Sequence, residues 1–327
     1  MGTTKRLATY GLAVVLLAAG AYAVGSVVGP RVQPPAPVAM EHDPATTAPA
    51  GVPAAAAPHA EAGHDGGAAQ GADLPAGLAS SRGGYTLVPV TPSLTPGAST
   101  EFAFRVTGPD GNPVTAFDVE HDKRMHLIVV RRDTAGFQHV HPEMAADGTW
   151  SVPLTLPAGG SYRAFADFAP TGGAGTTLGV DLAAPGAFEP KTYAPSRTAN
   201  VDGYTVTLTG ELVPGQGSPV TLSVAKDGKP VTDLQPYLAA YGHLVALRGG
   251  DLAYLHVHPE GQPGDGRTPA GPEIKFVAEV PSAGDYRLFL DFQHGGVVRT
   301  AEFTVATGPA VPDAPAATGH SAEPHGH

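Results

Sequence analysis

The sequence contains no cysteine, which excludes disulfide bonds, thiolate nucleophiles and cysteine-ligated zinc sites. It has only four methionines, the initiator among them, which argues against a methionine-rich copper(I) site. Charged residues make up 15% of the chain, and the basic ones are scarcer, with 19 Lys and Arg against 30 Asp and Glu. Nucleic-acid binding needs a basic surface that releases counterions from phosphates, so we expect no nucleic-acid partner. Imidazole and carboxylate are the metal-ligating groups that remain.

The first 30 residues indicate export from the cytoplasm. Lys5 and Arg6 precede an uncharged, largely apolar run over residues 7–30, and a membrane-spanning helix needs roughly 20 such residues. Positive charge before the run places the N-terminus in the cytoplasm and the rest of the chain outside it. The sequence therefore predicts a single-pass signal anchor in the cell membrane. The alternative is a secreted protein, released by cleavage after the small-x-small motif Ala21-Tyr22-Ala23.

Glycine and proline are abundant, with 43 and 34 residues, and many lie in two segments without a sustained apolar period, 31–83 and 308–327. Such composition predicts a disordered linker and a disordered tail. Together these segments carry six histidines. They are either solvated linker residues or low-affinity metal ligands that raise the local concentration of metal ions around the domains.

A duplication is the strongest pattern in the chain. The signature His-Val-His-Pro-Glu occurs twice, and in each copy a further histidine lies 13 residues before its first histidine. The repeated histidines are His126, His139 and His141 in the first copy and, 117 residues later, His243, His256 and His258 in the second. Similar residues flank both copies, so each repeat is about 100 residues long, a normal domain size.

The repeat and the composition together predict six segments. They are a signal anchor or transmembrane segment (1–30), a disordered linker (31–83), a first β-sandwich (84–183), a connector (184–200), a second β-sandwich (201–307) and a histidine-containing tail (308–327).

Within each repeat the pattern is that of short β-strands separated by Gly, Pro and Asp turns. The first repeat is expected to have strands at 101–106, 125–131, 137–141, 150–156, 162–168 and 176–182. Tyr162 and Tyr286 each follow a glycine by two residues and resemble the tyrosine corner of immunoglobulin-like domains. The fold class is therefore predicted to be all-β, with two tandem Ig-like β-sandwich domains.

Hairpin geometry predicts that the repeated histidines converge. Gly249-Gly250 suits a two-residue type I′ turn, since glycine adopts the positive φ angles that this turn needs. Pairing outward from the turn would place His243 opposite His256, with His258 on the same face because strand side chains alternate. The same arithmetic in the first repeat would place His126 opposite His139, with His141 diagonal to it.

Three imidazoles on one face suit copper(II) or zinc. A fourth ligand could come from a carboxylate or histidine near the trio, and the first repeat offers two accessory groups. These further candidates are Asp167, Asp291, Glu143, Glu260 and His294, with His121 and Met125 as the accessory groups. The alternative is that the histidines are structural and hydrogen-bond backbone or carboxylate neighbours.

The stretch Met125-His126-Leu127-Ile128-Val129-Val130, followed by Phe137-Gln138-His139-Val140-His141-Pro142, resembles uncharacterised bacterial membrane-anchored or exported proteins with tandem histidine-rich Ig-like domains. The second copy departs from the pattern, with Gly242 in place of Met125 and Leu255 in place of Gln138. The resemblance implies an extracytoplasmic β-sandwich protein associated with copper or other heavy metals.

No Ser-His-Asp order, phosphate loop or HExxH motif stands in a suitable context, so we expect no enzyme. The leading hypothesis is an extracytoplasmic protein that buffers, senses or delivers copper(II) or zinc. One alternative is a non-catalytic envelope module that binds another envelope protein, and a second is a copper redox enzyme. Because the ordinary imidazole pKa is about 6.5, the metal hypothesis predicts weaker binding as the pH falls toward 5.

Overall fold

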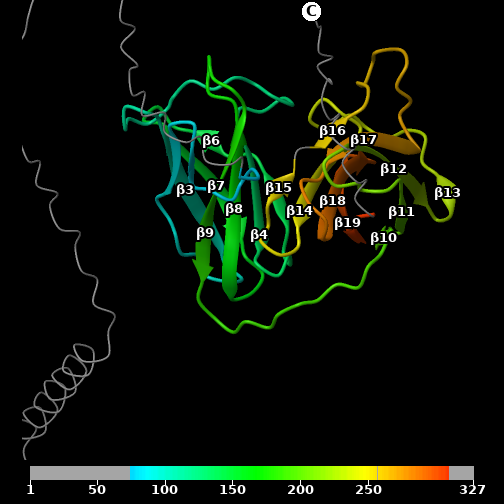
Figure 1. Cartoon of the computed structure of the whole chain (residues 1–327), viewed down its shortest axis with the longest axis horizontal. Coiled ribbons are helices and arrows are strands. Elements are labelled where there is room, and N and C mark those ends of the chain that lie inside the picture. Colours follow the sequence, from blue (N-terminus) through cyan, green and yellow to red (C-terminus); the bar gives the residue numbers. More distant parts are fainter. Residues whose placement is uncertain (1–73, 256, 309–327) are drawn as a thin grey trace, which may run out of the picture. The chain divides into compact units, whose positions relative to one another are not determined.

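The computed structural model describes residues 74–255 and 257–308, all within one compact unit, Gly66–His327. Every regular element among them is a β-strand (Figure 1), which confirms the predicted all-β fold. In this part of the chain no helix has the length and apolar character to cross a bilayer. The predicted anchor, most of the predicted linker and tail, and His256 lie outside the described residues.

The first repeat contains nine strands in two antiparallel sheets, ordered β1-β2-β3-β7-β6 and β5-β4-β8-β9. The strands are β1 (Ser81–Arg82), β2 (Tyr85–Pro89), β3 (Ser99–Thr107), β4 (His126–Arg131), β5 (Gln138–Val140), β6 (Glu143–Met144), β7 (Thr149–Thr155), β8 (Gly160–Phe168) and β9 (Thr176–Ala184).

The second repeat has the same plan. One sheet is ordered β10-β11-β12-β17-β16, with β13 paired to β12, and the other β15-β14-β18-β19. The strands are β10 (Thr198–Val201), β11 (Tyr204–Thr209), β12 (Gly217–Lys226), β13 (Lys229–Pro230), β14 (His243–Arg248), β15 (Tyr254–Leu255), β16 (Val257–Pro259), β17 (Glu273–Glu279), β18 (Asp285–His294) and β19 (Val297–Ala306).

Each repeat is an Ig-like sandwich closed around its own core. In β3, Phe102, Phe104 and Val106 are fully buried while the residues between them are more exposed, the alternation expected of a strand with one face on a core. The core of the first repeat joins these side chains to residues of the facing sheet, such as Leu127 and Ala164. The second repeat has an equivalent core built from both of its sheets.

Both predicted tyrosine corners are present. The Tyr162 hydroxyl donates to the carbonyl of Ala158 at 2.8 Å, and the Tyr286 hydroxyl donates to the carbonyl of Ser282 at 2.7 Å. Each tyrosine thereby ties the start of a long strand, β8 or β18, back to the loop that precedes it.

The predicted hairpin register is wrong by two residues. Ile128, not His126, lies opposite His139 in the β4–β5 pair, and Ala246 lies opposite Leu255 in the β14–β15 pair. A shift of two keeps every side chain on its predicted face, because strand side chains alternate with a period of two. His126 and His139 therefore still share a face.

The turn used for that prediction is also different. Neither Gly249 nor Gly250 has a positive φ; the left-handed residue is Leu252, with φ 64°. The loop closes through a hydrogen bond from the backbone N–H of Arg248 to the carbonyl of Ala253, and the Arg248 side chain donates to Asp251. A longer loop built on this Arg–Asp pair replaces the two-residue type I′ turn.

In the second repeat the histidine signature does not form the outer strand of a hairpin. β15 ends at Leu255, and β16 pairs with β17 in the opposite sheet, where His258 lies across from Val277. In the first repeat the chain crosses to the opposite sheet after its signature histidines. There β5 extends to Val140, and β6 pairs with the opposite sheet only from Glu143. The prediction of two equivalent hairpins is therefore wrong for the second copy.

The two repeats share a third apolar core. Ile128, Val130 and Phe165 of the first repeat pack with Val245, Leu247, Leu252 and Phe289 of the second. The contacts are reciprocal: Phe137 stacks on Phe289 with ring centroids 4.0 Å apart, and Tyr254, which corresponds to Phe137 in the repeat, lies 5.6 Å from Phe165, which corresponds to Phe289. Sheets β5-β4-β8-β9 and β15-β14-β18-β19 therefore face one another.

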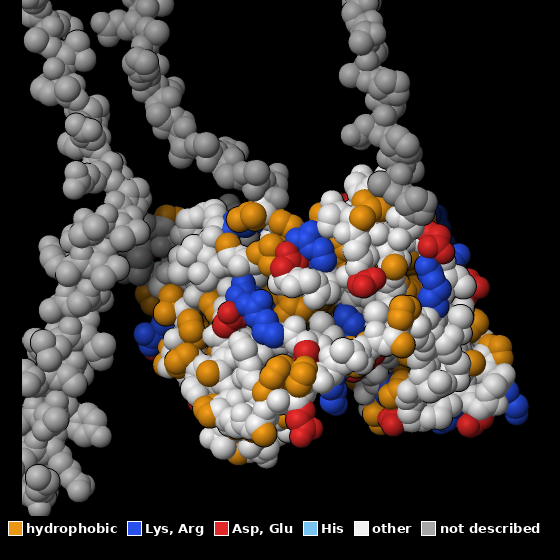
Figure 2. All heavy atoms as spheres, turned by 60° about the horizontal axis from the view of Figure 1, so that its bottom comes forward, with side chains coloured by type: hydrophobic (Ala, Val, Ile, Leu, Met, Phe, Trp, Pro, Cys, Tyr) orange, Lys and Arg blue, Asp and Glu red, His pale blue; other side chains and the backbone are white. Residues whose placement is uncertain are grey.

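On the face shown in Figure 2, acidic and basic side chains are interspersed and no basic patch gathers. Several ion pairs join the two kinds of charge at the surface, including Arg132 with Asp181 and Arg197 with Glu211.

Candidate metal centre

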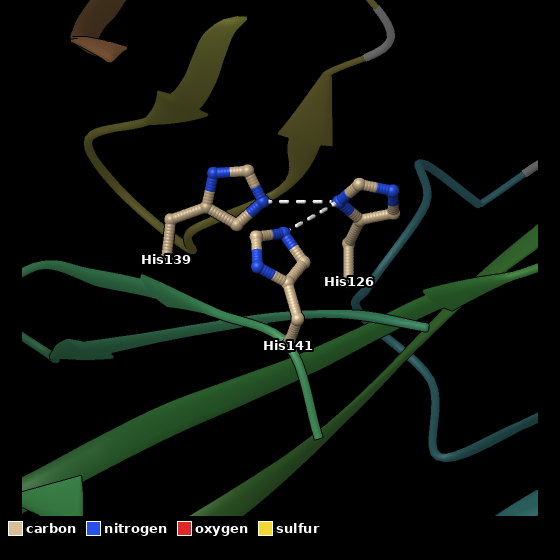
Figure 3. Close-up of side chains that lie close together, drawn as sticks. All are labelled: His126, His139 and His141. Carbon is tan, nitrogen blue, oxygen red and sulfur yellow. Dashed lines mark hydrogen bonds between the residues drawn. The ribbon is translucent and has the colours of Figure 1, made fainter. Parts of the chain in front are cut away.

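Three histidines of the first repeat meet at the edge of the β4–β5 pair. His126 begins β4, His139 is the central residue of β5, and His141 comes directly after β5 ends. The Nδ1 atom of His126 lies 3.1 Å from Nε2 of His139 and 3.2 Å from Nε2 of His141 (Figure 3). One ligand atom from each side chain lies within 4.8 Å of the other two.

A backbone carbonyl fixes the tautomer of His126. Its Nε2 lies 3.0 Å from the carbonyl oxygen of Glu120, which can only accept a hydrogen bond. Nε2 therefore carries the proton, and the lone pair is on Nδ1. That lone pair faces the other two imidazoles (Figure 3).

A carboxylate from the second repeat fixes the tautomer of His139. Its Nδ1–H donates to Oδ2 of Asp291 at 2.8 Å, and both side chains are only 5% exposed. The other oxygen of Asp291 accepts from the hydroxyl of Thr300 at 2.6 Å. The Nε2 lone pair of His139 is thus directed at His126, in the carboxylate–histidine arrangement that commonly orients and strengthens a metal ligand.

The spacing of the trio suits a metal ion. Nδ1 of His126 and Nε2 of His139 lie 3.1 Å apart. When both imidazoles are neutral, two lone pairs face one another, an unfavourable contact that a cation between them would relieve. Around a tetrahedral zinc ion with Zn–N distances of 2.0–2.1 Å, ligand nitrogens would lie about 3.3 Å apart. The observed separations of 3.1 and 3.2 Å need only a small adjustment to reach that value.

Burial lowers the pKa of two of the three imidazoles, those of His126 and His141. Loss of solvent lowers the pKa of His126 to about 4, an effect that the hydrogen bond to Glu120 partly opposes and the neighbouring histidines increase. Burial, followed by the proximity of His139 and His126, lowers the pKa of His141 to about 3. At pH 5 these two ligands are still deprotonated, so we expect proton competition at His126 and His141 to set in nearer pH 4.

His243, the counterpart of His126 in the second repeat, lies close to the trio without joining it. Its ring centroid is 6.3 Å from that of His139. Its Nε2–H donates to the carbonyls of Tyr237 and Leu238 at 3.0 and 2.8 Å, so its lone pair is on Nδ1. Burial lowers its pKa to about 4, with further contributions from His139 and His121.

The two accessory candidates of the first repeat differ. His121 is exposed, with φ 48°, and its ring lies 6.1 Å from that of His126 and 5.3 Å from that of His243. Met125 is 1% exposed and packs in the core of the first repeat, where its thioether fills space. His121 is therefore near the trio, and Met125 is a packing residue.

Two of the carboxylate candidates lie on strands next to the histidines, and two lie on the opposite sheets. Asp167 lies opposite His126 across the β4–β8 pair and accepts from the hydroxyl of Thr177 at 2.8 Å, whereas Asp291 accepts from His139 as described above. Glu143 and Glu260 are exposed on the side of the opposite sheets. Neither of these glutamates is brought to the trio.

Two further histidine candidates do not join the trio. His258 is exposed on β16, opposite Val277. His294, at the end of β18, contacts the hydroxyl of Tyr204 at 2.7 Å and the carboxylate of Asp233 at 3.1 Å.

The sequence did not predict that the second repeat completes the site of the first. Asp291 was expected to serve as a ligand within its own repeat, and it instead orients His139 across the interface. A signal was present in β4, whose sequence His-Leu-Ile-Val-Val-Arg is apolar at four consecutive positions and is buried throughout. A strand with two buried faces has a second packing partner, here the other repeat.

The comparison with protein families agrees with the tandem architecture. A family model described as a domain of unknown function, DUF8832, matches residues 80–185 and again residues 199–308. The chain belongs to the DUF8832 family. The histidine trio lies in the first DUF8832 domain, and Asp291 lies in the second. A search of curated proteins finds no match.

Several solved structures of bacterial surface proteins are similar to the DUF8832 chain at low identity. Invasin, a bacterial integrin-binding protein, is 14% identical over 67% of this chain and 39% of its own, with a TM-score of 0.22. A putative membrane-anchored protein from Corynebacterium diphtheriae is 11% identical over 74% of this chain and 62% of its own, with a TM-score of 0.21. The Escherichia coli adhesin FdeC is 17% identical over 72% of this chain and 66% of its own, with a TM-score of 0.22. The match to this chain thus covers less than two thirds of the length of each of these three proteins.

Proposed function

We propose that this protein binds one copper(II) or zinc ion through His126, His139 and His141. The observation that carries the proposal is the convergence of the three side chains, two of them with lone pairs fixed toward the centre by Glu120 and Asp291. Imidazole nitrogens are suitable ligands for both ions. The absence of cysteine leaves no thiolate that would favour copper(I).

Metal binding in this proposal depends on both repeats. The first repeat supplies the ligands and the second supplies the carboxylate that orients His139. The apolar core between the repeats holds β4 and β18 in place, so that a buried carboxylate meets the imidazole without rearrangement. A preorganised site of this kind binds an ion tightly because little ordering is left to be done on binding.

We also propose that the protein acts outside the cytoplasm. The positive residues and the apolar run before residue 31 support an anchor in the cytoplasmic membrane, with both sandwiches outside the cytoplasm. There the protein would buffer, sense or deliver the ion. The second trio predicted from the sequence includes His256, outside the described residues, so a second ion in the other repeat stays a prediction.

The test is the number of ions bound by the purified full chain. Metal-free protein is incubated with excess copper(II) or zinc, desalted, and analysed for bound metal. We expect joint replacement of His139 and His141 by alanine to remove one ion per chain. His294→Ala is the matched control, because it removes a histidine that contacts Tyr204 and Asp233 instead of the trio.

Folding of each variant is checked by the fluorescence of the single tryptophan, Trp150, which is 1% exposed in the core of the first repeat. Unchanged metal content in a folded double variant would refute the proposal. If the double variant is less stable in metal-free buffer and chelator has no effect on the parent protein, the histidines are structural.

A further inference from the structure

A cleft of about 1100 Å³ opens beside the trio. His126 and His139 form part of its wall, and so do His121 and His243 from the loop and strand next to them. The cleft therefore reaches two of the three proposed ligands. It also brings the counterpart histidine of the second repeat to the same opening.

Within the part of the chain that the structure describes, three side chains supply ligand atoms at this point. Among residues 74–255 and 257–308, no other group of three or more histidine or carboxylate side chains gathers closely enough to hold an ion, and no fourth member joins the trio. Both oxygens of Asp291 already accept hydrogen bonds, from His139 and Thr300. Structural zinc sites are usually closed by four protein ligands, whereas three-ligand sites keep a position for water or another small ligand.

We infer that an ion held by the trio keeps one coordination position open to the cleft, occupied by water and exchangeable for a small anion. This inference rests on the proposed metal site. The cleft wall is suited to the bound water because Nδ1 of His243, which lines the cleft, is an acceptor, its ring proton being donated from Nε2 to two carbonyls. A metal-bound water has protons to donate to it.

The experiment uses copper(II)-loaded full chain and sodium azide. Copper(II) is the appropriate probe even if zinc is the native ion, since imidazole sites bind copper(II) more tightly than zinc. We expect azide to add a saturable ligand-to-metal charge-transfer band to the absorption spectrum. A spectrum that saturating azide leaves unchanged would overturn the open position while leaving the metal site intact. Failure to bind copper(II) at all would overturn the proposed function as well.

A bulky residue at the cleft tests where the small ligand enters. Gly175 lines the cleft, and a Cβ added there would have as nearest neighbours only the carboxylate oxygens of Glu120, at 3.8 Å. In Gly175→Trp we expect azide affinity to fall by about tenfold or more, with copper affinity unchanged. Val119→Trp is the matched control, since Val119 is 65% exposed and does not line the cleft. Equal azide affinity in the two variants would overturn the assignment of the open position to this cleft.

Discussion

The hydrogen bond between His139 and Asp291 gives the sharpest prediction, because it makes a ligand in one repeat depend on a residue in the other. The perturbation is Asp291→Asn, which keeps the size and shape of the side chain and removes its charge. The amide oxygen can still accept from Nδ1 of His139, but it no longer strengthens the basicity of Nε2 as a carboxylate does. In the parent protein the Thr300 hydroxyl donates to Asp291, whereas in the variant it would face the amide NH₂, itself a donor.

The expected loss follows from the geometry of this contact. The bond is 2.8 Å long and both side chains are 5% exposed, so solvent screens the interaction little. Changes to such outer-shell partners typically weaken metal affinity by about 10- to 100-fold. That range corresponds to about 1.4–2.7 kcal/mol of binding free energy.

The assay is a competition titration against a chromophoric chelator at pH 7, following the ion that is lost in the joint His139 and His141 variant. Asp167→Asn is the matched control, because Asp167 occupies the equivalent position on β8 and accepts from Thr177 in the same way. We expect the control to leave the affinity of this ion unchanged. An Asp291→Asn protein that binds the ion as tightly as the control would refute the orienting role of Asp291.

Three further predictions concern stability. The pKa of His126 is about 4 in the folded protein and about 6.5 in the unfolded chain, so between these pH values only the unfolded chain takes up the proton, and metal-free protein loses stability as the pH falls. We expect His126 alone to lower the free energy of unfolding by about 2 kcal/mol between pH 7 and pH 5, as measured by urea denaturation at each pH. Phe289→Ala removes a fully buried ring that stacks on Phe137, and we expect it to destabilise the protein by about 3–5 kcal/mol in the same assay, whereas a loss below 1 kcal/mol would mean that the core between the repeats contributes little. Tyr286→Phe removes the corner hydrogen bond to Ser282 and should cost about 1 kcal/mol, and unaltered stability would show that the hydroxyl is equally well satisfied by water.

Local patterns in the sequence were sufficient for the longer strands of the first repeat. The short runs separated by Gly, Pro and Asp turns, with the glycine-preceded Tyr162 and Tyr286, predicted a sandwich with two tyrosine corners, and these are present. These features depend only on residues a few positions apart. For the same reason the shared face of His126 and His139 was predicted correctly.

Register could not be predicted, because the loops use residues that rarely adopt positive φ. We predicted the left-handed conformation at Gly249 and Gly250, whereas Leu252 adopts it in the second repeat, and Thr134 and Gly136 adopt it in the first. A non-glycine residue is held there by surrounding contacts, here the Arg–Asp pairs of the two loops. Arg and Asp at this spacing do not by themselves indicate which neighbouring residue takes a positive φ.

The contact of Asp291 with the first repeat could not be predicted by considering each repeat separately. Counting ligands within one repeat treats each copy as complete, whereas the orienting carboxylate comes from the other copy, 152 residues later in the chain. Only the apolar run of β4 indicated that a second surface covers this strand.

The reciprocal packing of Phe137 on Phe289 and of Tyr254 against Phe165 is the contact pattern of an isologous homodimer, in which each half offers the other the same patch. In a dimer of identical subunits, any substitution would appear twice. Joining the halves in one chain removes that constraint, so one copy can keep a ligand while the other exchanges it. His121, whose ring lies beside that of His243 in the other repeat, corresponds to Leu238 in the second copy, so the two halves are chemically different here.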